Sequence, residues 1–345
     1  MLARTLTGRQ SEAHHWREIL AGAVRSPTDL LKRLELDPAL AGAAGHGHQL
    51  FPVLVPEPYL RRIRVGDADD PLLRQVLPGP GESRQASGFV ADPVDDAEAR
   101  RAPGVLQKYR GRALLIASGG CAINCRYCFR REFPYHDNHA AQHNWRAALD
   151  WLNQHDDIQE VILSGGDPLL LPTARLRRLT DELPGMGHIE RLRIHTRLPV
   201  VIPQRVTDEL CAWLQQTPLP VAMVLHINHE REIDDAVRAA LAALRDSGVT
   251  LLNQAVLLRG VNDSVRAQAG LARTLFAAGV LPYYLHLLDR VRGTADYEVS
   301  ADLARRIVAE LRAQLSGYLV PRLVCEVPGA GSKTPIEPML TDISA

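Results

Sequence analysis

From residue 112 onwards, short apolar runs alternate with longer amphipathic stretches of helical character. Seven runs have the composition of strands: 113–117, 160–163, 191–194, 221–225, 250–256, 282–287 and 322–327. After the first they begin about 30 residues apart, the length of a strand plus its crossover helix, which predicts a parallel sheet. Six such units are fewer than the eight of a closed barrel. We expect an α/β fold, an open partial (β/α)6 barrel with the last run beside it, although a doubly wound sheet fits the same spacing.

The chain divides into three predicted parts. Residues 1–100 form an N-terminal helical region and linker, residues 101–320 the barrel, and residues 321–345 a C-terminal segment. Within the first part, 26–29 (Ser-Pro-Thr-Asp) predicts a helix start, because it places a capping serine before proline and an acid in the first turn. The glycine- and proline-rich stretch 78–88 is predicted to be a loop or linker.

Composition limits the partners. The 345 residues are 46% hydrophobic, enough for a sizeable core, and 40 Lys and Arg balance 40 Asp and Glu. The balanced charge produces no overall electrostatic field that would attract nucleic acid or an anionic membrane. No stretch of the sequence resembles a signal peptide or a membrane span. Five unevenly placed cysteines make a poor disulfide framework and suit a reducing compartment. We expect a soluble, cytoplasmic protein.

Polar side chains gather where the predicted strands end, the place where parallel α/β proteins carry their chemistry. Each is a weak signal alone, since an isolated loop histidine or asparagine is usually structural, but their common location points to one site. They are Ser164, Asp167, His195, Thr196, Arg197, His226, Asn228, His229, Asn253, Gln254, His286, Asp289, Glu326 and Lys333.

Three of the five cysteines, Cys121, Cys125 and Cys128, lie within eight residues. A structural zinc site would need a fourth ligand, and Cys211 and Cys325 are distant in the sequence. The sharper alternative is a [4Fe–4S] cluster on three thiolates, whose fourth iron is open to a substrate or cofactor. For zinc, the fourth ligand could come from one of three nearby histidines: His136, His139 or His143.

The spacing Cys-x3-Cys-x-aromatic-Cys, with Tyr127 as the aromatic residue, resembles the signature of radical S-adenosylmethionine (SAM) enzymes. The resemblance implies a barrel of radical SAM type, in which the open iron binds SAM and an electron from the cluster yields a 5′-deoxyadenosyl radical. Four residues one βα unit later look like the superfamily's glycine motif, which contacts the amino group of SAM: Ser164, Gly165, Gly166 and Asp167.

Lys333 lies in a glycine-rich segment, 327–335, near the C-terminus. A degenerate phosphate loop is one interpretation, but the residue directly before the lysine is not glycine, and Pro335 discourages the helix that should follow. A flexible tail is another. With the cysteine motif upstream, a third interpretation is a Schiff base between Lys333 and pyridoxal 5′-phosphate (PLP).

The two motifs together resemble the lysine 2,3-aminomutase family, from Asp70 to Lys333, about three quarters of the chain. The stretch 252–263 looks most like the bacterial subgroup that serves elongation factor P. The resemblance implies that Lys333 carries PLP, that Arg130 pairs with the substrate carboxylate, and that two acids grip the far ammonium of lysine. The remaining implied residues are Lys108, Tyr109 and Arg112 for PLP, His226 and Gln254 near SAM, and Asp289 and Glu326 as the acids, the last standing where aspartate is common.

The implied reaction is an isomerisation of free L-lysine to β-lysine, with an electron donor of unknown identity. In the subgroup a separate ligase attaches β-lysine to elongation factor P, although β-lysine also serves antibiotics or osmolytes. Larger clostridial-type members continue beyond the PLP lysine, which leaves homo-oligomer formation open here. Two other classes fit the motifs less fully: a radical SAM enzyme without PLP that modifies a peptide or nucleic acid, and a zinc-stabilised module whose arginines bind an acidic partner.

Overall fold

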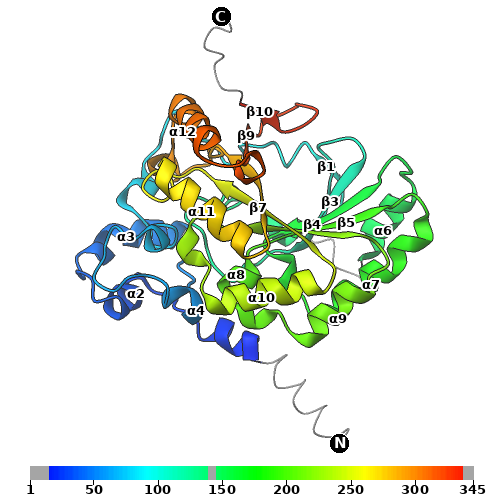
Figure 1. Cartoon of the computed structure of the whole chain (residues 1–345), viewed down its shortest axis with the longest axis horizontal. Coiled ribbons are helices and arrows are strands. Elements are labelled where there is room, and N and C mark those ends of the chain that lie inside the picture. Colours follow the sequence, from blue (N-terminus) through cyan, green and yellow to red (C-terminus); the bar gives the residue numbers. More distant parts are fainter. Residues whose placement is uncertain (1–14, 139–144, 337–345) are drawn as a thin grey trace, which may run out of the picture.

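The computed structural model describes residues 15–138 and 145–336. Its sheet follows the chain, strand beside strand, from β1 to β10 (Figure 1). Seven central strands are parallel: β3 (Arg112–Ser118), β4 (Glu160–Gly165), β5 (Arg191–Thr196), β6 (Val221–His226), β7 (Thr250–Val256), β8 (Leu281–His286) and β9 (Arg322–Cys325). This order has no reversal, so it excludes a doubly wound sheet and confirms the barrel-type α/β fold.

The edges of the sheet differ from the prediction. The run 322–327 is predicted to lie beside the barrel, whereas β9 pairs in parallel with β8 and becomes a seventh parallel strand. Three short antiparallel strands border the parallel set: β1 (Arg100–Ala102), β2 (Val105–Leu106) and β10 (Thr334–Pro335). Their two or three residues are too short to produce a readable alternation pattern.

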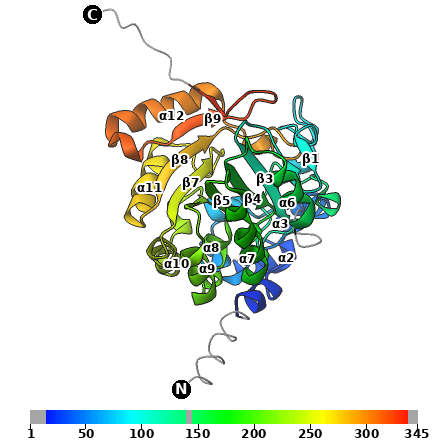
Figure 2. The ribbon, with the colours of Figure 1, turned by 90° about the vertical axis from the view of Figure 1, so that its right-hand side faces the viewer.

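Helices cover the outer face of the curved sheet (Figure 2). They are α6 (Arg146–Asn153), α7 (Thr173–Glu182), α8 (Leu198–Val201), α9 (Asp208–Gln216), α10 (Asp235–Asp246), α11 (Val265–Ala277) and α12 (Ala301–Gln314). Each long helix buries an apolar stripe; in α10 it comprises Val237, Leu241 and Leu244. None of the helices in the described ranges has the length and hydrophobicity that crossing a membrane requires.

Strand β5 shows how the sheet separates core from site. Leu192 and Ile194 are buried in the core on the side covered by helices, while Arg193 and His195 alternate with them, line the cavity on the other side and are only half-buried. Because successive side chains of a strand point to opposite faces, the inner face is left for polar residues. The interior of the open barrel is therefore available for a ligand.

The N-terminal region is helical: α2 (Pro27–Arg33), α3 (Leu40–Leu50), α4 (Glu57–Leu60) and α5 (Pro71–Arg74). Ser26 caps α2 by position, as the sequence predicts, although its side chain makes no capping hydrogen bond. The apolar residues of this region join the same core cluster as those of the barrel strands. The stretch 78–88 is a loop with one 3-10 turn (Pro80–Ser83), but it is packed against the barrel rather than a free spacer, because Glu82 is buried.

Candidate active site

A cavity of about 790 Å³ opens among the carboxyl ends of the parallel strands. It contains the cysteine loop that follows β3 and also Lys333, which stands about 200 residues later in the sequence. The turn between β9 and β10 returns the chain alongside β9, with Thr334 opposite Cys325, and so carries Lys333 into the barrel. Every residue that the sequence assigns to the cluster, SAM, PLP or the substrate lines this one cavity. Three of the strand-end polar residues do not line it: Asn228, His229 and Asn253.

The three cysteines occupy one tight loop. The amide of Cys128 donates to the carbonyl of Cys125 at 3.0 Å, and all three thiols line the cavity. Burial, and then the neighbouring cysteines, raise the pKa of the Cys121 thiol well above its usual range, and burial raises that of Cys128 to about 11. Three thiolates drawn together from one short loop would need a cation among them, and iron would supply that charge.

Iron would have to draw the thiols together. Among the described residues, no three His, Cys, Asp or Glu side chains already form a metal-binding group. The proposed fourth zinc ligands do not change this: His136 lies in a short 3-10 turn outside the cavity lining, and His139 and His143 lie outside the described residues. Three thiols on one loop, with no fourth protein ligand beside them in the described residues, suit a cluster with one open iron better than structural zinc.

The glycine segment holds the cysteine loop. Gly165 has a φ of +113°, and a Cβ placed on Gly166 would lie only 2.1 Å from the carbonyl oxygen of Gly120. The amides of Gly166 and Asp167 donate to the carbonyls of Ser118 and Gly120, each at 2.7 Å. From the sequence, we expect these glycines to let the backbone approach a ligand closely. In the structure, Gly165 and Gly166 approach the backbone of the cysteine loop.

Asp167 has a structural task. Its carboxylate accepts hydrogen bonds from the Thr196 hydroxyl at 2.7 Å and from the amides of Arg197 and Leu198. The side chain therefore ties the end of β4 to the loop after β5. A direct contact between this carboxylate and SAM is not needed to account for its position.

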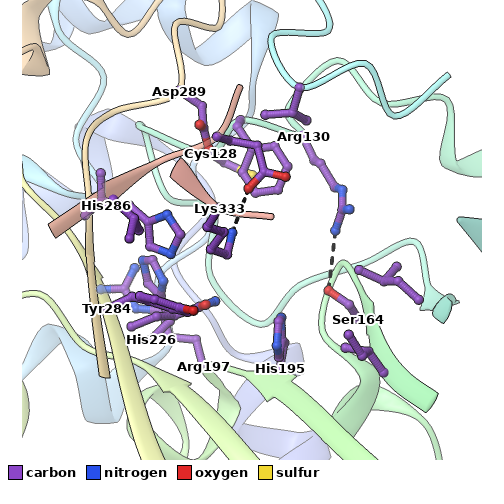
Figure 3. A pocket seen from close by; sticks show the side chains of 18 of the residues that line it. Cys128, Arg130, Ser164, His195, Arg197, His226, Tyr284, His286, Asp289 and Lys333 are labelled. Atoms are coloured by element: carbon purple, nitrogen blue, oxygen red, sulfur yellow. Dashed lines mark hydrogen bonds and ion pairs between the residues drawn. The ribbon is translucent and has the colours of Figure 1, made fainter. Parts of the chain in front are cut away.

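Lys333 lies in the middle of the cavity and makes an ion pair that the sequence did not predict (Figure 3). Its Nζ is 2.7 Å from Oε2 of Glu326, while the Tyr109 hydroxyl donates to Oε1 of the same carboxylate at 2.5 Å. Burial alone would raise the pKa of Glu326, but the charge of Lys333 and the two hydrogen bonds bring it below its ordinary value. The extra methylene that distinguishes Glu326 from aspartate is thus accommodated by two partners.

Asp289 lines the same cavity as Lys333 and is drawn above it in Figure 3. Burial raises its pKa to about 7; the charge of Lys333 opposes this rise and that of Glu326 adds to it. Two carboxyl groups that destabilise each other's charge form a place where one cation binds favourably.

Arg130 is held by an acid that the sequence analysis missed. Its Nε donates to Asp96 at 2.6 Å and its Nη1 to the Ser164 hydroxyl at 3.3 Å. Asp96, with a side chain only 1% exposed, also pairs with Lys108 at 2.8 Å. The Arg112 guanidinium lies over the ring of Tyr109, 4.6 Å from its centre. Asp96 therefore orients both Arg130 and Lys108 from a loop that carries no recognisable motif.

A second buried network was also missed. Arg197 donates to the sulfur of Cys125 at 2.7 Å and to the Tyr127 hydroxyl at 2.8 Å. The Nη2 atom of Arg197 donates to the side chains of Gln75 and Glu232, at 2.7 and 2.8 Å. Neither acceptor lies in a motif, so only the fold reveals that the N-terminal region contributes to the surroundings of the cysteine loop.

Comparison with known proteins gives the family. The sequence profile of the Radical SAM superfamily matches residues 115–269. The L-lysine 2,3-aminomutase of Escherichia coli is 46% identical over 337 residues, which are 97% of this chain and 98% of that protein. The chain belongs to the lysine 2,3-aminomutase family. The Haemophilus influenzae member is also 46% identical, over 94% of this chain and 96% of its own.

Members of the lysine 2,3-aminomutase family differ in length. The Clostridium subterminale member is 36% identical over 81% of this chain, but the match covers 67% of that protein. Among solved structures, a radical SAM methyltransferase from Sphaerobacter thermophilus is 20% identical over 64% of this chain and 68% of its own, with a TM-score of 0.45. The match thus covers 98% of the E. coli member but only 67% of the C. subterminale member.

Radical SAM chemistry in this family implies a [4Fe–4S] cluster and SAM, and the aminomutase reaction implies PLP. The residues present suit all three: three thiols from one loop line the cavity with no fourth protein ligand among the described residues, and the primary amine of Lys333 lines the same cavity. The histidines of the cavity are held neutral, because burial lowers the pKa of His226 to about 3 and those of His195 and His286 well below the usual value.

Proposed function

We propose that this protein interconverts L-lysine and β-lysine, using a [4Fe–4S] cluster, SAM and PLP. The observation that carries the proposal is that the cysteine loop and Lys333 line one cavity beside two acids, in a chain 46% identical to an L-lysine 2,3-aminomutase. The cofactors supply a carbon-centred radical and a site on which nitrogen can migrate. The chain supplies positioning and exclusion of competing reactions.

The proposed residue roles follow the geometry. Cys121, Cys125 and Cys128 would hold the cluster, with SAM bounded by the segment 164–167 and by His226 and Gln254. Lys333 would bind PLP through its side-chain amine. The PLP ring would lie near Tyr109, and the PLP phosphate near Arg112 and Lys108. The support is that all of these residues line the cavity.

The substrate would be gripped at both ends. Arg130 would bind the carboxylate through the edge of its guanidinium that Asp96 leaves free, and Asp289 and Glu326 would bind the far ammonium. An analogue without that ammonium would leave two acids buried without a cation. Placement within about 1 Å matters, because larger errors cost on the order of a hundredfold in rate.

The direct test is an anaerobic incubation of the protein with L-lysine, SAM, PLP and a low-potential reductant. We expect β-lysine by mass spectrometry after chiral derivatisation, none from L-norleucine, and a borohydride-reduced PLP adduct on the peptide that contains Lys333. Turnover of SAM without β-lysine, and without a PLP adduct, would favour a radical SAM enzyme that acts on a peptide or nucleic acid. Zinc in place of iron and sulfide would support the interaction module.

Lysine binding should depend on pH through Asp289. Only the ionised carboxylate attracts the substrate ammonium, and the pKa of Asp289 is about 7, so the proton competes with the substrate below that pH. The positive charge of Lys333 lowers the pKa of Asp289. Because attachment to PLP removes that charge, the pH of the binding transition stays at or above 7. We expect KM for lysine to rise by up to about tenfold per pH unit below the transition. Asp289→Asn should bind lysine weakly and lose this transition; an unchanged KM profile in the variant would reject the role.

We further propose that the β-lysine is destined for elongation factor P, through a separate ligase, and that the protein acts in the cytoplasm. The support is the near end-to-end similarity to the E. coli protein and five free cysteines. Deleting the gene should remove the mass of one β-lysyl group from elongation factor P, and an unchanged mass would redirect the product to another use.

A further inference from the structure

The Glu326 carboxylate is fully engaged within the protein. The Tyr109 hydroxyl donates to Oε1, and the Lys333 ammonium pairs with Oε2 at 2.7 Å (Figure 3). The Glu326 side chain is only 10% exposed, so the pair is largely withdrawn from water. A buried carboxylate of this kind strongly prefers to keep a cationic partner.

The partner here is chemically the same group that the proposed substrate would bring. Lys333 and free L-lysine each carry a primary ammonium on a four-carbon stem. Asp289 lines the same cavity; burial raises its pKa, the charge of Lys333 opposes that rise and the charge of Glu326 adds to it. The two acids therefore favour a closely bound cation, and in the cofactor-free protein the cation nearest to Glu326 is Lys333, since Lys108 lies farther away, at 3.9 Å.

The nitrogen of Lys333 cannot remain an ammonium at Glu326 and also bind PLP. On loading, the ammonium releases a proton to solvent, its nitrogen forms a C=N bond with the aldehyde carbon, and the aldehyde oxygen leaves as water. Loading thus removes the nearest cation from Glu326, and the Lys108 ammonium, 3.9 Å from Oε1, is paired more closely with Asp96 at 2.8 Å. The carboxylate remains in place because its other oxygen is still bonded to Tyr109.

We propose that Glu326, positioned by Tyr109, is an exchange site for primary ammonium groups. Lys333 fills the site in the cofactor-free protein, and the far ammonium of the substrate fills it once Lys333 has been transferred to PLP. The inference rests on the proposed function only for the identity of the incoming amine. Its consequence is an order of binding: the cofactor-free protein excludes L-lysine, and PLP loading creates the place where lysine binds.

The test measures L-lysine binding to the full-length, PLP-free protein by isothermal titration calorimetry, with no turnover involved. Lys333→Met removes the internal ammonium and keeps the length of the side chain. We expect Lys333→Met to bind L-lysine at least about tenfold more tightly than the wild type, because loss of a close charge pair is worth that factor or more. L-norleucine, which lacks the far ammonium, should bind both proteins equally weakly.

Two further variants locate the effect. Adding Glu326→Gln to Lys333→Met should abolish the gained affinity, and adding Tyr109→Phe should reduce it for L-lysine without changing norleucine binding. Thermal melting gives an independent measurement: L-lysine should raise the Tm of Lys333→Met and of Lys333→Gln, but not that of the PLP-free wild type.

Equal affinity of the wild type and Lys333→Met for L-lysine, or no gain in either Lys333 variant, would overturn the exchange site. This failure is separable from failure of the proposed function, which is measured by β-lysine formation and PLP trapping in the wild type. A protein that makes β-lysine and yet shows no gained affinity would keep the activity and reject the exchange.

Discussion

Cys128→Ala is expected to lose its iron and sulfide and to lower β-lysine formation by at least roughly four orders of magnitude, as removal of an indispensable catalytic group does. Three thiolates are the fewest that hold a [4Fe–4S] cluster with one open iron, and Cys121 and Cys125 alone leave a second iron without its ligand. Burial also raises the pKa of the Cys121 thiol well above its usual range, which disfavours its thiolate without a metal. Iron and sulfide analysis after anaerobic reconstitution, followed by the product assay, measures both effects.

The matched control is Cys211→Ala. Cys211 lies in α9, outside the cavity lining, and its thiol donates to the carbonyl of Ala243 at 3.9 Å. This variant should keep cluster content and activity. Cys128→Ala should still fold and form a borohydride-trapped PLP adduct, because Lys333 lies on a separate turn. Full iron content in Cys128→Ala, or equal loss in both variants, would contradict the assignment of the cluster.

The features that were predictable from sequence are local. The run 250–256 predicts a strand because its composition and boundaries lie within seven residues, and β7 has the same bounds. The cysteine triplet and the loop of Lys333 are also contiguous, so their chemistry can be read without the fold. Their meeting in one cavity was expected from strand order, since carboxyl ends of parallel strands lie at one edge.

The features that escaped prediction are pairings between distant residues. Nothing in the sequence indicates that Asp96 orients Arg130, or that Gln75 accepts from Arg197, 122 residues away. Such choices depend on which loops the sheet brings together, and a charged residue in a loop usually remains in solvent. The ion pair between Lys333 and Glu326 needs the β9–β10 turn, whose two-residue second strand is too short to predict.

Glu82 is the ion-pair residue whose substitution should lower the free energy of unfolding the most. It stands in the stretch 78–88, yet its side chain is 3% exposed and pairs with Arg126 and Arg131, which stand before and after Cys128 in the sequence. Arg126, itself fully buried, also donates to the carbonyls of Gly47 and Phe51. One carboxylate thus joins the N-terminal region to the cysteine loop.

Glu82→Ala is expected to lower the free energy of unfolding by about 3–5 kcal/mol, because it leaves two buried guanidinium groups without their counter-charge. Glu190→Ala is the control: Glu190 also pairs with an arginine, Arg191, but the two side chains are 52% and 47% exposed, and such a pair contributes about 0–1 kcal/mol. Urea unfolding followed by tryptophan fluorescence compares the two, and iron content reports whether the cysteine loop is disturbed. Glu82→Gln, which keeps some hydrogen bonds without the charge, should fall between wild type and Glu82→Ala. Equal midpoints for Glu82→Ala and Glu190→Ala would mean that the arginines find other partners and that the buried carboxylate does not secure the loop.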